Sequence, residues 1–341
     1  MCMQNVYLDP NSYVHLQNVL FERSDRYNTN NCREPVIFLS EYCSKRGINL
    51  QTIDFWDREK ASAQDIYVSF DHKFFLRKWY WRKRNPQYPR VDLAKFKKRI
   101  LFHFEPPTVM AEIRYIAKSA MRAYDKAFFT WKIPGTNAQY FHTPQAHEGL
   151  FFEYWQNENR AFLTLINSNR SSLSRYKELL TERVRAILFF GKTHDIDLYG
   201  FGWDARPLFP YWFSGDAIRK TYKGSVEDKY KTLSQYTFAF AVENCELPGY
   251  ITDKVFDCFY AGTIPLYLGA PDIEEYIPKD CFIDMRDFRN YEELRKFLKQ
   301  LSQEEIKTYK ENGRRFLESE HYKPFTKEHF ARLFVEACQD A

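Results

Sequence analysis

The sequence of 341 residues lacks several features that would direct it to a membrane or out of the cell. No apolar run approaches the roughly 18 residues that a membrane-spanning helix needs. The N-terminus, MCMQNVYLDPNSY, has neither the basic nor the apolar stretch of a secretion signal. The seven cysteines are scattered, without a Cys-x-x-Cys pair or a Cys/His spacing typical of zinc sites. These absences predict a cytoplasmic protein that contacts a membrane, if at all, from its inner face.

The positive charge is concentrated in one segment. The formal net charge is +5, but residues 71–100 hold 11 Lys and Arg against two Asp, a net of +9, so the rest of the chain sums to −4. Within it, segment 73–99 interleaves Trp79, Tyr80 and Trp81 with basic residues. This pattern indicates either a patch for an anionic partner or, more commonly, a solvated basic face with buried aromatics. As the partner we expect a peripheral anionic membrane contact and no nucleic acid.

Short apolar runs alternate with helical patterns twice along the chain, and no internal repeat interrupts them. We expect strands at 5–9, 48–54, 65–70, 99–104 and 126–131, with a helix over 34–46 that Gly47 ends. After about residue 155 the expected strands are RAFLTLINSN, DIDLYGFGW, YTFAFAVEN, TIPLYLGA and CFIDM, with helices over 174–185, 225–236 and 252–261. The alternation predicts parallel sheets with crossover helices. Its recurrence predicts two doubly wound α/β domains, residues 1–155 and 156–341, with the last helix a candidate to pack back on the first domain.

One stretch, ENCELPGYITDKVFDCFYAG (243–262), combines a strand end, a Pro-Gly turn and a helix start. Thr252 is expected to cap a helix that has Asp253 in its first turn and ends at Gly262. Tyr250, Asp253 and Lys254 then stand near free helix N–H groups, where α/β folds bind phosphates.

Lys254 is poorly placed for the helix dipole in that first turn, and an anionic ligand would remove the conflict. The alternative is an exposed lysine paired with Asp253 or Asp257, and the local physics leaves the two interpretations equal.

The order of these residues resembles the donor-binding signature of the α1,3-fucosyltransferases, glycosyltransferase family 10. That signature has a Phe-Glu-Asn-Ser run, a Tyr-Val-Thr-Glu-Lys run, a Val/Ile-Pro pair and a glycine. The stretches here that stand in the same order are Glu243-Asn244, Tyr250-Ile-Thr-Asp253-Lys254, Gly262-Thr-Ile-Pro265 and Leu268-Gly-Ala270. CFIDMRDF (281–288) resembles the Ser-Phe-Ile…Asp-Phe run that follows in the family, and the similarity is dense over about residues 160–290.

Two further segments extend the resemblance. INSNRSSLSRYKELL places Ser168, Asn169 and Arg175 at matching positions, and ILFHFEPPTV places Glu105 where the family's proposed catalytic base lies. Asp253 is a departure, because the family has the longer Glu there, and Cys245 replaces the usual Ser. Without the N-terminal anchor of eukaryotic Golgi members, the chain is similar to the soluble bacterial or viral type.

The resemblance implies a GT-B fold, with two Rossmann-like domains facing a central cleft, and an inverting transfer of L-fucose from GDP-fucose. The implied acceptor is a glycan hydroxyl, α1,3 or α1,4 on GlcNAc or Glc of a galactosyl-GlcNAc-type unit. Glu105 would be the general base. Arg175 and Lys254 would stabilise the leaving diphosphate. The full implied donor-binding set is Ser168, Asn169, Arg175, Asn244, Tyr250, Asp253 and Lys254.

No cofactor is expected beyond the donor substrate, since no Asp-x-Asp triplet stands at a strand end, although stimulation by a divalent metal stays open. Structural alternatives also stay open for three residues: Glu105 as a loop carboxylate paired with nearby bases, Arg175 as a helix-surface partner of Glu178, and Tyr250 as a packing residue. Two alternative functions remain as well. The first is a GT-B enzyme with another nucleotide sugar, and the second is a non-catalytic carbohydrate or nucleic-acid binding module.

Overall fold

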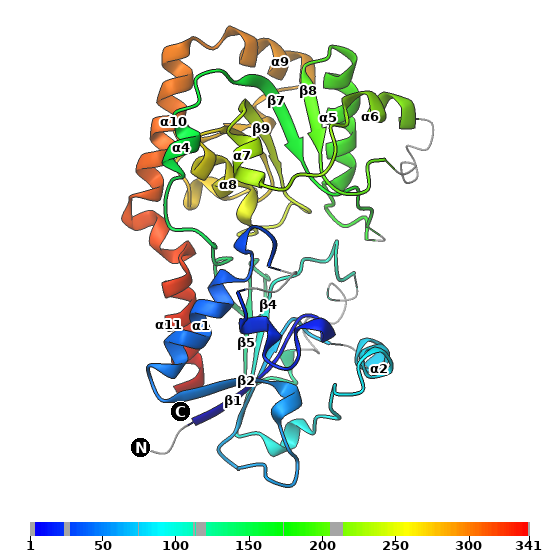
Figure 1. The fold of residues 1–341 in the computed structure, drawn as a ribbon, viewed down its shortest axis with the longest axis vertical. Coiled ribbons are helices and arrows are strands. Elements are labelled where there is room, and N and C mark those ends of the chain that lie inside the picture. Colours follow the sequence, from blue (N-terminus) through cyan, green and yellow to red (C-terminus); the bar gives the residue numbers. More distant parts are fainter. Residues whose placement is uncertain are drawn as a thin grey trace. The chain divides into compact units, whose positions relative to one another are not determined.

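The computed structural model describes residues 4–23, 28–73, 75–111, 113, 121–172, 174–204 and 214–339. The chain forms two compact units (Figure 1). One ends at His147 and takes in the segment from Pro324 onward, and the other runs from Glu148 to Lys323.

The first unit is built on a parallel sheet, with six strands among the described residues, in the order β2-β1-β3-β4-β5-β6. The strands are β1 (Gln4–Asp9), β2 (Ile48–Thr52), β3 (Ile66–Phe70), β4 (Lys98–His103), β5 (Lys126–Phe129) and β6 (Gln139–Tyr140). The helices named in this unit are α1 (Glu34–Ser44), α2 (Phe75–Arg84) and α11 (Lys327–Gln339). Every residue of β3 is buried, as expected for a central strand of a sheet covered on both faces.

The C-terminal helix α11 packs beside α1 and completes the core of the first unit (Figure 1). Its apolar face places Phe330 and Phe334 against Phe102 of β4, and the rings of Phe102 and Phe334 stack with centroids 5.6 Å apart. Phe102 also stacks on Phe128 of β5, at 4.7 Å. The end of the chain therefore belongs to the same core as its beginning.

The second unit has a five-stranded parallel sheet within the described ranges, in the order β11-β10-β9-β7-β8. Its strands are β7 (Ala161–Ile166), β8 (Ile196–Tyr199), β9 (Tyr236–Val242), β10 (Ile264–Leu268) and β11 (Ile283–Asp284). Its helices are α4 (Phe152–Trp155), α5 (Leu180–Lys192), α6 (Gly215–Thr221), α7 (Lys229–Leu233), α8 (Asp253–Ala261), α9 (Tyr291–Gln300) and α10 (Gln303–Leu317).

Each sheet reverses its winding direction at one point. In the second unit the chain passes from β7 outward to β8, then returns to the other side of β7 and winds through β9, β10 and β11. The loops after β7 and β9 therefore diverge at the carboxyl edge, and such a switch point is where open α/β sheets bind ligands. In the first unit the corresponding point lies between β1 and β3.

The two doubly wound sheets confirm the expected architecture, but two predicted helices are wrong in extent. The helix expected over 174–185 begins only at Leu180, because Lys177 has a left-handed φ of 50° and the Leu179 N–H donates to the Asn244 carbonyl at 3.1 Å. The helix expected over 225–236 shortens to α7, since the Asp228 side chain accepts from the N–H groups of the two residues that follow Lys229 and so fixes its start.

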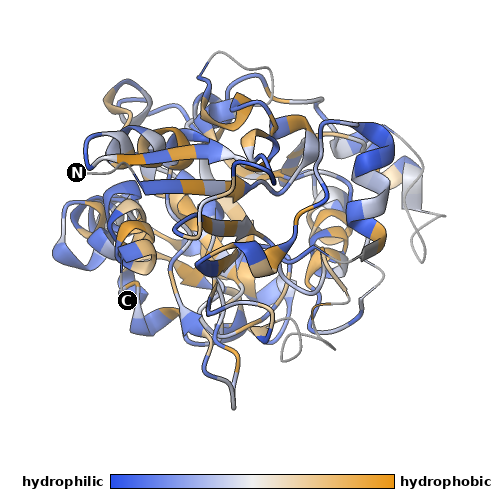
Figure 2. Cartoon of the chain, turned by 90° about the horizontal axis from the view of Figure 1, so that it is seen from below, coloured by the Kyte–Doolittle hydropathy of each residue, from blue (hydrophilic) through white to orange (hydrophobic). Residues whose placement is uncertain are grey.

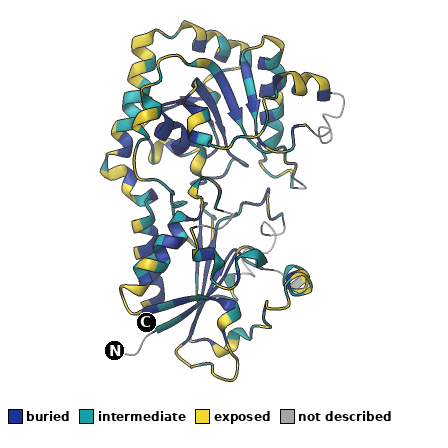
Figure 3. Cartoon of the chain, viewed as in Figure 1, coloured by how far each residue is buried: buried dark blue, intermediate teal, exposed yellow. Residues whose placement is uncertain are grey.

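Burial follows the layers of each unit. Apolar residues are most frequent on the strands and the packed helices, and the central strands of both sheets, β3 and β9 among them, are largely buried (Figures 2 and 3). Within the described ranges, none of the helices combines the length and the apolar character needed to cross a bilayer.

Candidate functional site

Two loops that the sequence singled out leave the second sheet at its switch point, from neighbouring strands. Ser168 and Asn169 follow β7, and Glu243 and Asn244 follow the neighbouring strand β9. The Asn169 side-chain amide donates to the Gly202 carbonyl at 2.9 Å, so Asn169 ties the loop after β7 to the loop after β8. Ser168 is half-buried beside it.

Glu243 is fully buried at the end of β9, where a carboxylate needs partners to remain charged. Its Oε1 accepts from the backbone N–H of Thr252 at 2.7 Å, and its Oε2 lies 2.9 Å from the Lys254 ammonium. Gly269 makes room for this side chain, because a Cβ at position 269 would lie 2.6 Å from the Glu243 Cγ. Glu243 therefore connects the end of β9 to the start of α8.

The start of α8 differs from the expected cap. Thr252 is the residue before the helix, but its hydroxyl makes no bond to a helix N–H and instead donates to Glu243 Oε2, at 2.8 Å. The first-turn N–H groups are thus left for another acceptor. The helix ends as expected at Gly262, which takes the left-handed conformation with φ 65°.

Two hydrogen bonds hold the Lys254 side chain at the start of α8. Its ammonium donates to Glu243 and, at 2.8 Å, to the Thr252 hydroxyl, and its side chain is 17% exposed. An ammonium group has three hydrogens. Two are directed at Glu243 and Thr252, and Asp253 Oδ1 lies 3.8 Å from the nitrogen, beyond hydrogen-bond distance. The alternative prediction, that Lys254 is ion-paired, is therefore right, but its main partner is Glu243 and not Asp253 or Asp257.

A second lysine, Lys229 at the start of α7, forms an ion-paired group with two carboxylates of α8. Its ammonium lies 3.0 Å from Asp253 Oδ2 and in direct contact with Asp257. Burial raises the pKa of Asp257 to about 7, although Lys229 acts against this. Burial also opposes ionisation of Asp253, but Lys229 and Lys254 outweigh it and hold the pKa of Asp253 well below its usual range. Asp253 therefore stays charged, with a side chain that is 57% exposed.

Arg183 of α5 holds the loop after β9 by hydrogen bonds. Its buried guanidinium donates to the Val242 carbonyl at 2.6 Å and to the Asn244 side-chain oxygen at 2.9 Å. Burial lowers the pKa of Arg183 to about 10, which leaves it charged at neutral pH. The Asn244 side chain is thus engaged by Arg183, in a contact that holds the loop after β9.

Arg175 and Tyr250 occupy contrasting positions. Arg175 lies in the segment before α5 and is 64% exposed, with its guanidinium 3.9 Å from Glu178. The pair with Glu178 is thus present but not on a helix. Tyr250 is buried at the loop between β9 and α8, and its backbone N–H donates to the Leu247 carbonyl.

Three residues of this group were not predicted from the sequence: Glu243 as a binding element, Lys229 and Arg183. An acid directly after the apolar strand FAFAV is a signal for the first. A second signal is the position of Arg183 at the spacing of the buried face of α5, which includes Ala186, Ile187 and Phe190. No local pattern marks Lys229.

Glu105 lies in the first unit, just after β4. Its backbone N–H and that of Phe104 both donate to Asp71 Oδ1, at 3.1 and 2.7 Å. Asp71 is buried beside the His103 ring, with Nδ1 3.3 Å from the carboxylate. The backbone that carries Glu105 is therefore fixed at the carboxyl edge of the first sheet.

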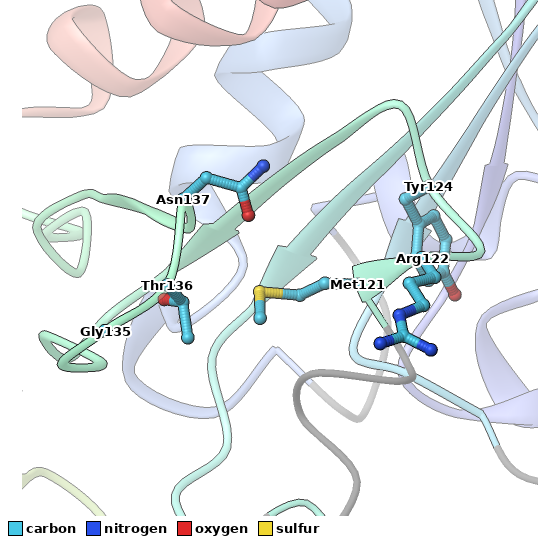
Figure 4. A pocket seen from close by; sticks show the side chains of 6 residues that line it. All are labelled: Met121, Arg122, Tyr124, Gly135, Thr136 and Asn137. Carbon is cyan, nitrogen blue, oxygen red and sulfur yellow. The ribbon is translucent and has the colours of Figure 1, made fainter.

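The first unit also contains an open pocket of about 620 Å³. Arg122 and Tyr124 line one side, Thr136 and Asn137 the other, and Met121 lies between them (Figure 4). Its lining of guanidinium, hydroxyl and amide groups matches the hydrogen-bonding groups of a sugar. In the part of the chain that the structure describes, no three His, Cys, Asp or Glu side chains gather as a metal site.

Comparison with known proteins identifies the family of the C-terminal half of the chain. The family model for the C-terminal part of glycosyltransferase family 10 (fucosyltransferase) matches residues 163–340. An α-(1,3)-fucosyltransferase, FucT, of Helicobacter pylori is 34% identical over 87 residues, which are 26% of this chain and 18% of that protein. The mouse 4-galactosyl-N-acetylglucosaminide 3-α-L-fucosyltransferase 9 is 40% identical over 72 residues, 20% of each protein. The chain thus spans about a fifth of the length of these curated relatives.

Solved structures are similar over the whole chain. An α-glucosyltransferase crystallised with UDP and a 13-mer DNA superposes with a TM-score of 0.58, covering 100% of both chains at 9% sequence identity. At that identity the likeness concerns the fold alone. It confirms the expected α/β fold of GT-B type with two parallel sheets.

Proposed function

This chain belongs to glycosyltransferase family 10, the fucosyltransferases, and we propose that it transfers L-fucose from GDP-fucose to a hydroxyl of an acceptor glycan. The observation that carries the proposal is the Lys254 ammonium, held by buried Glu243 at the start of α8 beside the switch point of the second sheet. A cation beside free helix N–H groups at such an edge suits a nucleotide diphosphate.

The diphosphate of the donor would lie between the α8 N-terminus and the loop after β7. The remaining hydrogen of Lys254 and the first-turn N–H groups would meet its oxygens. Arg175, exposed in the segment before α5, would turn from Glu178, 3.9 Å away, toward the same oxygens, and Ser168 and Asn169 would shape the loop between them. The Asp253 carboxylate would accept a hydrogen bond from a hydroxyl of ribose or fucose. Its exposed carboxylate supports this role despite the shorter side chain.

Asn244 and Tyr250 would act differently from the residues that touch the donor. Asn244 is held by Arg183 and would keep the loop in place, and buried Tyr250 would pack the same loop from inside.

The transfer would proceed with inversion at the anomeric carbon. The bond from that carbon to the β-phosphate oxygen breaks, the bond to the acceptor oxygen forms, and GDP leaves with the bonding electrons. Lys254 and the helix N-terminus would stabilise the charge that develops on the diphosphate. Because these groups already supply positive charge, we propose that no cofactor is required beyond the donor, with a divalent metal at most stimulating the rate.

Glu105 would take the proton of the acceptor hydroxyl during attack. The support is its place directly after β4, with the backbone held by two hydrogen bonds to buried Asp71. For the acceptor we propose GlcNAc or Glc of a galactosyl-GlcNAc-type unit, linked α1,3 or α1,4. The names of the two relatives support the GlcNAc acceptor and the α1,3 linkage. The pocket that contains Arg122 and Asn137 is its candidate site in the first unit.

Thermal unfolding with nucleotide sugars tests the donor. GDP-fucose should raise the unfolding temperature more than UDP-glucose or GDP-mannose at equal concentration, because a ligand that binds only the folded state stabilises it. Equal shifts with UDP- and GDP-sugars would contradict the donor and favour a GT-B enzyme with another nucleotide sugar.

A panel of glycans incubated with GDP-fucose, with the product linkage read by NMR, tests the acceptor. Fucosylation of galactosyl-GlcNAc units at the 3- or 4-hydroxyl is expected. Release of GDP without a fucosylated glycan would contradict the transferase activity.

A further inference from the structure

Helix α2 presents an apolar and aromatic stripe to solvent. Leu76 is 74% exposed, Trp79 53% and Tyr80 43%. Positions 76, 79 and 80 have the spacing of neighbours on one helix face, and Lys83 follows on the same face one turn later. Figure 3 shows exposed residues on this helix, whose place is labelled in Figure 1. Large side chains gathered in this way on a surface usually mark an interaction site.

The opposite side of α2 fixes the helix to the first unit. Trp81 is buried and packs its ring against Tyr13 and Tyr88, with centroids 6.2 and 5.3 Å apart. The Arg77 guanidinium reaches the sulfur of Met110 at 3.5 Å. The interpretation of segment 73–99 as a basic face with buried aromatics is therefore right for Trp81 but wrong for the stripe, because these anchors turn Trp79 outward.

Basic residues surround the stripe. The helix sequence FLRKWYWRKR has five Lys and Arg and no acid. The Lys83 ammonium lies 5.7 Å from the centre of the Trp79 ring, and the Arg84 guanidinium 5.4 Å from that of Tyr80. The two cations thus lie next to the two exposed rings, so the apolar surface and the positive charge are on the same exposed face of α2.

We propose that α2 docks the protein on an anionic lipid bilayer. Tryptophan and tyrosine rings favour the depth of the lipid headgroups, and lysine and arginine beside them attract anionic headgroups. Leu76 distinguishes this occupant from a nucleic acid, since an exposed aliphatic side chain gains by entering the acyl boundary but cannot stack as a base partner does. The stripe is short, so the contact is peripheral and reversible. The inference is independent of the donor and acceptor.

Co-sedimentation of the full chain with vesicles tests the proposal. Vesicles of phosphatidylcholine with about one-third phosphatidylglycerol should bind the protein, and pure phosphatidylcholine vesicles should bind it far more weakly. Trp79→Ala/Tyr80→Ala should weaken binding to the anionic vesicles about tenfold through lost apolar contact. Lys83→Gln/Arg84→Gln should weaken it by about fivefold per charge removed. All four side chains are exposed, and Tyr80 also packs its ring against Tyr13, with centroids 6.5 Å apart. Unfolding temperatures measured without vesicles therefore check that α2 stays in place in each variant.

Matched controls separate this face from the rest of the surface. Phe55→Ala removes an exposed ring of the same unit, and Lys296→Gln/Lys307→Gln removes two exposed charges of α9 and α10. Neither should change vesicle binding. Equal binding to both vesicle types, no binding, or equal losses in the controls would overturn the proposal. Tight binding of single-stranded DNA at physiological salt that is lost in the α2 variants, without vesicle binding, would instead identify a nucleic-acid surface.

Discussion

The buried carboxylate of Glu243 lies 2.9 Å from the ammonium of Lys254, and this pair joins the end of β9 to the first turn of α8. It explains how a lysine is tolerated near the positive end of a helix dipole, since a full negative charge stands beneath it. It also orients the lysine, because two of its three hydrogens are directed at Glu243 and Thr252.

Replacing Glu243 with Gln tests this pair. The variant keeps the shape but places an uncharged amide beside Lys254 in a buried site, so we expect it to lose about 1–3 kcal/mol of unfolding free energy. GDP-fucose affinity should fall about tenfold as the lysine loses its orientation. Denaturant unfolding and titration measure the two effects, and exposed Glu274→Gln is the control. Unchanged affinity in a folded Glu243→Gln variant would show that the pair is structural only.

Asp253 is the position at which this chain departs from its family. Asp253→Asn should reduce kcat/KM about tenfold or more, since it removes the carboxylate that would accept a hydrogen bond from a sugar hydroxyl. It also leaves Asp257 as the carboxylate partner of Lys229. Asp253→Glu should keep most of the activity, because the longer side chain has space to extend from an exposed position. Initial rates at varied GDP-fucose distinguish these outcomes. Full activity in Asp253→Asn would remove Asp253 from the donor site.

Glu105→Gln tests the proposed base. Transfer should fall by about 10²–10⁴-fold, the usual size of a general-base effect, while GDP-fucose binding is retained. The control is Glu59→Gln, an exposed acid of the same unit. If the Glu105→Gln variant turns over as fast as the wild type, another group accepts the proton.

The first unit should lose stability in mild acid through His103. Burial lowers the pKa of His103 to about 4 from an ordinary 6.5; Asp71 opposes this shift and Lys73 adds to it. The ring also accepts the His72 backbone N–H at Nδ1, 3.0 Å away, so a proton there would break that bond. In the unfolded chain His103 therefore takes up a proton near pH 6.5, whereas in the folded chain it takes one up only near pH 4. The contribution is fully present above pH 6.5 and is lost as the pH falls toward 4.

Unfolding temperatures from pH 7.5 to 4.5 measure this loss, which for His103 amounts to at most about 3 kcal/mol. His103→Gln should flatten the acid limb in part, because burial also lowers the pKa of His72 and of His142 to about 4. His321→Gln, at an exposed position, should leave the limb unchanged. Parallel acid limbs in the wild type and His103→Gln would contradict this assignment.

The sequence was informative where a residue's role follows from its own element. Strand runs such as YTFAFAV and the Gly262 helix end are local patterns, and the structure confirms them. The helix start at Leu180 was not predictable locally, because the preceding turn is shaped by the Leu179 hydrogen bond to Asn244, a residue 65 positions later.

The candidate site shows the same division. Lys254 and Asp253 stand in one motif, and its order, read together with Asn169, Arg175 and Glu105, resembles a donor-binding signature. Lys229 reaches Asp253 and Asp257 only because α7 packs on α8, a contact between segments that no spacing reveals. The sequence also did not indicate which aromatic residues of α2 are exposed. Trp79 and Trp81 are two residues apart, yet Trp79 is on the surface and Trp81 is in the core.

Calorimetric titration of GDP-fucose into the wild type, Lys254→Gln and the exposed-lysine control Lys279→Gln tests the donor site most directly. We expect saturable binding to the wild type and the control, and affinity weaker by about tenfold or more in Lys254→Gln, because a charge-assisted bond to the diphosphate is lost. Equal affinity in all three proteins, or UDP-glucose binding as tightly as GDP-fucose, would contradict a GDP-fucose site at Lys254.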